Sequence, residues 1–69
     1  MHLSARNVLE GTIKAITQGP TNTRVKLELA GGAIVTSSIT TEAAQELGLA
    51  IGDTAYAVIK ASDVMIGKR

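Results

Sequence analysis

Apolar and polar residues alternate along several stretches of the chain, and this period of two predicts half-buried strands. In residues 8–16 the odd positions from Leu9 to Ala15 are apolar or glycine, and the even positions from Glu10 to Lys14 are polar. Residues 23–29 alternate in the same way, with apolar side chains at positions 25, 27 and 29. Residues 33–39 and 54–60 are predicted as the third and fourth strands. The fourth is apolar on both faces, which predicts burial against the domain's own core and against a neighbouring subunit.

A change of period at Thr40 predicts one short helix between the third and fourth strands. Thr40 or Thr41 can cap its start, an apolar stripe includes Leu47, and Gly48 is a typical stop signal. Glycines 31 and 32 favour a hairpin, and residues 61–63 are turn formers followed by a short apolar run, 64–66, predicted as a fifth strand. The order predicts an all-β fold, a five-stranded OB-like Greek-key barrel, with residues 1–69 as a single domain.

Composition limits how such a barrel becomes stable. The chain has 69 residues, 45% of them hydrophobic, and no cysteine. A domain of this size buries only about 60% of the surface that its unfolded chain exposes, and it has no disulfide to add stability. We therefore expect a homo-oligomer. No apolar segment approaches the ~20 residues of a membrane span and no leader sequence is evident, which favours a cytoplasmic protein without a membrane partner.

The residue types argue against an enzyme and against a metal site. The single histidine is His2, cysteine is absent, and six carboxylates are scattered along the chain. Tyr56 is the only aromatic residue and the net charge is +1, so a nucleic-acid partner is not expected either, because OB barrels bind nucleic acid with stacking rings and a basic groove. Two alternatives stay open at this point: an oligomeric interaction module without an anion ligand, and an OB-type nucleic-acid-binding domain.

Hydrogen-bond donors suited to an oxyanion fall on three segments. Arg6 follows Ser4 at the head of the first strand, and Lys60 precedes Ser62 at the end of the fourth. The predicted helix start near Thr40 adds a hydroxyl and backbone N–H groups. Guanidinium and ammonium groups with hydroxyls beside them suit a tetrahedral dianion. Each of these residues, taken singly, also has an ordinary role as a surface charge, a turn residue or a cap.

Four segments carry a resemblance to a known family: residues 4–8 (Ser-Ala-Arg-Asn-Val), 25–29, 39–49 and 56–62. Together they resemble the molbindins, small molybdate-binding proteins of the Mop type built from the TOBE/Mop domain. The resemblance implies a homo-hexamer, a trimer of dimers, that holds molybdate or tungstate at subunit interfaces and serves in storage and homeostasis of the oxyanion. Because no second module or DNA-binding segment is seen, we expect the free-standing storage form.

The resemblance also implies the site residues. Ser4 and Arg6 match the family's anion-binding arginine motif. Its lysine motif is matched by Lys60 with Ala61 and Ser62. Thr40 matches a hydroxyl donor at the helix start, and Ala43 stands where a relative has serine, so only its backbone N–H could serve. A second class of oxyanion site near a threefold axis is implied for the family, and Thr21 and Asn22 look like the matching segment.

Overall fold

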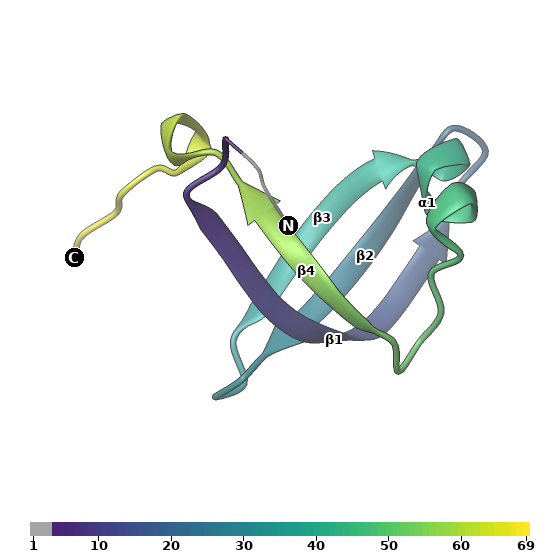
Figure 1. The fold of residues 1–69 in the computed structure, drawn as a ribbon, viewed down its shortest axis with the longest axis horizontal. Coiled ribbons are helices and arrows are strands. Elements are labelled where there is room, and N and C mark those ends of the chain that lie inside the picture. The colour runs from purple at the N-terminus through teal and green to yellow at the C-terminus, as the bar shows by residue number, and fades with distance from the viewer. Residues whose placement is uncertain (1–3) are drawn as a thin grey trace.

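The protein folds into a strongly curled antiparallel sheet with one short helix (Figure 1). The computed structural model describes residues 4–69, and His2 lies outside the described residues. The elements in chain order are β1 (Asn7–Gln18), β2 (Asn22–Leu29), β3 (Ile34–Thr40), α1 (Thr41–Leu47), β4 (Thr54–Ile59) and the 3-10 helix η1 (Ala61–Asp63).

Strand β1 organises the sheet because it pairs with two neighbours. The strand order is β3-β2-β1-β4, and every neighbouring pair is antiparallel. Residues 7–12 of β1 pair with β4, and residues 11–18 pair with β2. Strands β3 and β4 are the two edges of this four-stranded sheet, and they face each other across its hollow side (Figure 1). The curled sheet confirms the all-β prediction, although the described chain leaves the barrel open between β3 and β4.

A β-bulge changes the face that β1 presents after its midpoint. Ile13 pairs with Leu27, but Ala15 pairs with the next residue, Lys26, so Lys14 is an extra residue in the ladder. Ile13 is completely buried, and Ile16 packs against the same core. The prediction that Ala15 shares the face of Ile13 is therefore wrong, because a single inserted residue reverses the alternation.

Helix α1 begins and ends where the sequence predicts. The Oγ1 atom of Thr40 accepts a hydrogen bond from the Ala43 N–H at 3.1 Å, and Gly48 ends the helix in the left-handed conformation with φ 63°. Leu47 of the predicted apolar stripe is 68% exposed. Its side chain lines the open hollow of the sheet.

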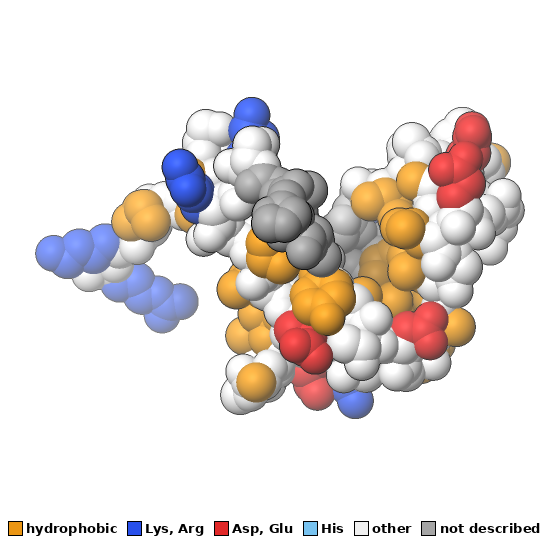
Figure 2. All heavy atoms as spheres, in the orientation of Figure 1, with side chains coloured by type: hydrophobic (Ala, Val, Ile, Leu, Met, Phe, Trp, Pro, Cys, Tyr) orange, Lys and Arg blue, Asp and Glu red, His pale blue; other side chains and the backbone are white. Residues whose placement is uncertain are grey.

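The core of the isolated chain is small. Ile13, Val25 and Leu27 are the buried apolar residues of the described chain. Beside them an apolar hollow of about 480 Å³ opens between β4 and the β3–α1 side, and Figure 2 shows its orange lining. On β4, Ala55 and Ala57 pack against the core, as expected from the alternation. Tyr56 and Val58 on the same strand remain about half exposed, which leaves apolar surface for a neighbour.

The predicted fifth strand does not form in the described chain. Residues 64–66 adopt no regular structure after η1, and Met65 and Ile66 are 93% and 91% exposed. A strand needs a neighbour for its backbone N–H and C=O groups, and this tail leads away from both sheet edges (Figure 1). Residues 64–66 have β propensity, but no strand among the described residues pairs with them.

Candidate functional site

The pairing of β1 with β4 brings Arg6 and Lys60 to the same end of the sheet. Asn7, the first residue of β1, pairs with Ile59, the last residue of β4, and the Asn7 side-chain amide donates to the Ile59 carbonyl at 3.2 Å. Arg6 and Lys60 are the next residues outward on the two strands. Two cations that lie far apart in the sequence thus belong to the same end of the sheet.

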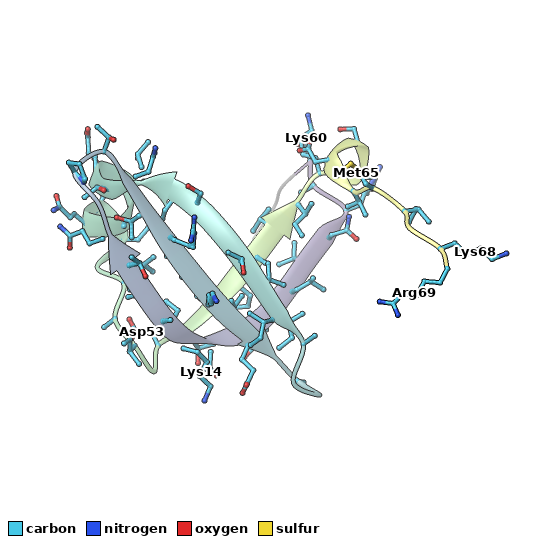
Figure 3. All side chains as sticks on the ribbon, turned by 180° about the vertical axis from the view of Figure 1, so that it is seen from behind. Lys14, Asp53, Lys60, Met65, Lys68 and Arg69 are labelled. Atoms are coloured by element: carbon cyan, nitrogen blue, oxygen red, sulfur yellow. The ribbon has the colours of Figure 1, made fainter. Side chains whose placement is uncertain are left out.

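The other residues predicted for this site lie next to Arg6 and Lys60 along the chain. Ser4 precedes Arg6 in the same exposed segment, and Ala61 and Ser62 lie in η1 directly after Lys60. The η1 turn is closed by a hydrogen bond of 2.9 Å from the Asp63 N–H to the Lys60 carbonyl. Figure 3 shows Lys60 beside this turn, and the tail with Lys68 and Arg69 extends beyond it. We call Ser4, Arg6, Lys60, Ala61 and Ser62 the cationic end.

Both cations of this end are free of carboxylate partners among the described residues. The ion pair of the described chain is Lys14–Glu28, with Nζ and Oε1 3.7 Å apart, at the bend of β1. Arg6 and Lys60 are exposed. Their donors are thus available to an anion from outside the chain.

The other predicted site residues lie together at the opposite end of β1. Thr40 pairs with Asn22 across β2 and β3, and the Thr41 N–H donates to the Thr21 carbonyl at 2.8 Å. Ala43 follows in the first turn of α1. We call Thr21, Asn22, Thr40 and Ala43 the hydroxyl end. Figure 1 shows α1 and η1 on opposite sides of the molecule.

A single chain therefore carries the predicted set as two separate halves. β1 has twelve residues, and the steps between them, at about 3.3 Å each, cover roughly 36 Å of bent strand path. The cationic end lies at its start and the hydroxyl end beyond its finish. The structure does not bring the two ends of one chain together.

The helix cap already uses one of the expected donors. The Ala43 N–H bonds to the Thr40 hydroxyl oxygen, so it is engaged within its own chain. A hydroxyl that accepts one hydrogen bond keeps its own hydrogen for donation. Thr40 thus offers a donor from its side chain, whereas Ala43 offers one only if the cap opens or the N–H is shared.

Two buried threonines lie beside the hydroxyl end, and their contact was not predicted: Thr23 was not singled out, and Thr41 was named only as an alternative helix cap. Thr23 is 1% exposed and Thr41 is 8% exposed. Their Oγ1 atoms lie 2.9 Å apart, and the Thr41 hydroxyl donates to the Gly19 carbonyl at 2.7 Å. The available signal was the position of Thr23, which falls in phase with the inward residues Val25 and Leu27. A polar residue at such a position requires a partner.

The described residues hold no cluster of three or more histidine, cysteine or acidic side chains that could ligate a metal ion. No helix in the described part of the chain is long and apolar enough to cross a bilayer.

Comparison with known proteins identifies the family. The family model of the TOBE domain matches residues 3–66. The chain is a TOBE-domain protein. A Haemophilus influenzae relative described as a probable molybdenum-pterin-binding protein is 42% identical over 67 residues, which cover 97% of each chain. The resemblance to the Mop-type proteins is thereby confirmed.

Solved structures of TOBE-domain relatives share the fold. The cytoplasmic molybdate-binding protein ModG, in a crystal form with molybdate bound, superposes with a TM-score of 0.90 at 54% identity. The match covers 94% of this chain and 46% of the ModG chain, so this chain spans about half of that relative. MopII from Clostridium pasteurianum, in an apo form, gives a TM-score of 0.92 at 40% identity, over 97% of this chain and all of MopII.

Proposed function

We propose that this TOBE-domain protein binds molybdate or tungstate as an intact oxyanion and that it stores and buffers the anion in the cytoplasm. Support comes from the relatives, which include molybdenum-pterin-binding proteins and the cytoplasmic molybdate-binding protein ModG. The role is binding without chemical conversion. No residue needs to act as an acid, a base or a nucleophile on the anion.

The observation that supports the proposal is the antiparallel pairing of Asn7 with Ile59, which leaves Arg6 and Lys60 at the same end of the sheet. In this proposal the two cations supply the charge, and Ser4 and Ser62 supply hydroxyl donors beside them. The Ala61 backbone, in the same turn, is a further hydrogen-bonding group of the site. Lysine and arginine can only donate hydrogen bonds, which suits the unprotonated oxygens of molybdate and leaves the O–H of hydrogenphosphate without an acceptor on them.

We further propose that the site is completed between copies of the chain in a homo-hexamer, a trimer of dimers. The cationic end of one copy would meet the hydroxyl end of another, with Thr40 as donor and the Ala43 N–H as an additional one shared with the helix cap. Thr21 and Asn22 would serve a second class of oxyanion site. The separation of the two ends within one chain supports this arrangement.

Exposed apolar surface supports self-association independently of the site. The hollow beside the core opens between the two edge strands, and residues 64–66 expose apolar side chains that nothing in residues 4–69 covers. A small domain that leaves this much apolar surface in water gains stability by covering it with another copy.

The size of the ligand limits the affinity that the site can reach. A tetrahedral oxyanion has five heavy atoms, and a ceiling of about 1.5 kcal/mol per atom gives roughly 7.5 kcal/mol. This free energy corresponds to a dissociation constant of roughly a micromolar. Such an affinity suits a protein that releases the anion again.

Calorimetric titration of the purified protein with molybdate, tungstate, sulfate and phosphate tests the function. Molybdate or tungstate should bind in the micromolar range, and the double variant Arg6→Gln, Lys60→Gln should lose this binding. Lys26→Gln is the matched control because Lys26 is an exposed strand lysine on β2, outside both ends. Absence of binding heat from both anions with the native protein would refute the proposal.

Mixing two inactive variants tests whether the site is shared between copies. Arg6→Gln, Lys60→Gln removes the cationic end, and Thr40→Val removes the hydroxyl donor of the other end. If each site takes one end from each of two chains, random co-assembly of equal amounts should restore roughly a quarter of the sites. A site contained in one chain would show no restoration.

A further inference from the structure

The buried threonine pair lies where the two segments of the hydroxyl end meet. One segment is the turn between β1 and β2 with the first residue of β2, which together carry Thr21 and Asn22, and the other is the end of β3, which carries Thr40. Thr40 pairs with Asn22 in the ladder, and Thr41 adds two hydrogen bonds to the turn. Its N–H donates to the Thr21 carbonyl at 2.8 Å, and its hydroxyl donates to the Gly19 carbonyl at 2.7 Å.

The direction of the hydrogen bonds follows from the chemistry of a hydroxyl, which has one hydrogen. The Thr41 hydroxyl uses its hydrogen on the Gly19 carbonyl, so in the 2.9 Å contact between the two hydroxyls Thr23 must be the donor. The result is a directed chain from Thr23 to Thr41 to Gly19. Both side chains are more than nine-tenths buried, so water cannot readily replace either bond.

The turn itself is closed by a short contact that leaves little freedom. The Gly19 N–H donates to the Asn22 carbonyl at 2.9 Å, and a Cβ at position 19 would lie only 2.7 Å from that carbonyl oxygen. Gly19 is therefore bonded to Asn22 through its N–H and to Thr41, the residue after Thr40, through its carbonyl.

We infer that Thr41, with Thr23 as its donor, is a positioning residue for oxyanion binding: its hydroxyl fixes Thr40 relative to Thr21 and Asn22. Thr41 does not itself contact the anion, because its hydroxyl is buried and fully engaged. This inference rests on the proposed function, since Thr40, Thr21 and Asn22 are the groups that it aligns. The proposed function uses neither buried threonine. The sequence offered Thr41 only as an alternative helix cap, and Thr40 fills that role.

The test compares Thr41→Val, which keeps the shape and removes the hydroxyl, with Thr41→Ser, which keeps the hydroxyl. Molybdate titrations are carried out at a temperature at which each variant is folded. Thr41→Val should bind molybdate at least roughly tenfold more weakly than the native protein. Without the Thr41 hydroxyl, Thr40 is no longer held in position relative to Thr21 and Asn22. Thr41→Ser should bind molybdate with an affinity within roughly twofold of that of the native protein.

A stability control separates positioning from a general loss of fold. Ile13→Val trims the completely buried core residue, which pairs with Leu27 and makes no hydrogen bond to the threonine pair, and it should lower Tm while leaving the molybdate dissociation constant unchanged. If Thr41→Val does not fold, Thr23→Val gives the same comparison, because it removes only the donor to Thr41.

The outcomes are distinct. Native affinity in Thr41→Val, or in Thr23→Val if that variant is used, overturns the inference and leaves the proposed function intact. A dissociation constant that Ile13→Val raises as much as Thr41→Val also overturns the inference, since the effect would then be one of stability. Failure of the native protein to bind molybdate overturns the proposed function first.

Discussion

Gly11 is the residue at which the close approach of β1 and β2 can be tested directly. It belongs to both pairings of β1, opposite Leu29 on one side and Ala55 on the other. A Cβ added at this position would lie 2.6 Å from the Glu28 carbonyl oxygen and 2.8 Å from the Leu27 Cγ. The leucine side chain can turn away, but the carbonyl belongs to the ladder and cannot move without shifting β2.

Gly11→Ala should therefore destabilise the protein, although alanine generally suits a strand better than glycine. Overpacking costs about 1–3 kcal/mol, and the gain from replacing glycine is roughly 0.5–1 kcal/mol, so the midpoints of the two ranges leave a net loss of about 1 kcal/mol. In a domain of this size a loss of about 1 kcal/mol lowers Tm by about 4–8 °C.

Thermal unfolding followed by circular dichroism measures this change. The protein concentration must be equal in all samples, because the Tm of an oligomer depends on it. Gly67→Ala is the matched control, since a Cβ there would meet nothing within 4 Å and should leave Tm unchanged. A Gly11→Ala protein that melts within about 2 °C of the native protein would refute the steric reasoning.

Two further changes test other parts of the structure. Asp53→Ala removes the carboxylate that accepts from the Ala50 N–H at 3.0 Å, and because this bond is exposed it should lower the free energy of unfolding by only about 0.5–1.5 kcal/mol in urea titrations; a loss above 3 kcal/mol would contradict the exposed geometry. Met65→Asp places a charge in the exposed apolar tail, and it should reduce the mass measured by light scattering at a given concentration if the tail covers a neighbouring copy. An unchanged mass would exclude that role for the tail.

Much of the fold follows from local patterns in the sequence. The phase of β2 was predictable because Val25 and Leu27 alternate with charged residues, and both are buried. The limits of α1 were predictable because Thr40 and Gly48 have specific backbone and side-chain roles at helix ends. The bulge at Lys14 was not predictable, since the small Ala15 fits either face of a sheet.

The remaining differences arise from contacts between distant segments. Residues 64–66 have strand propensity, but whether they pair depends on a free edge within reach, and no local pattern encodes this. Arg6 and Lys60 could be named as candidates from their neighbours, whereas their proximity depends on which strands pair. The Asn7–Ile59 contact spans 52 residues and appears only in the folded structure. The Thr23–Thr41 pair escaped prediction for the same reason.

The placement of the cationic end and the hydroxyl end at opposite limits of β1 has a thermodynamic consequence. If the oxyanion bridges two copies as proposed, a dissociated chain offers only half of the contacts, so apparent affinity must rise with protein concentration. By linkage, the anion must strengthen the assembly by the same factor. Anion binding and subunit assembly would then be one coupled equilibrium. A fall in protein concentration would by itself release the bound anion.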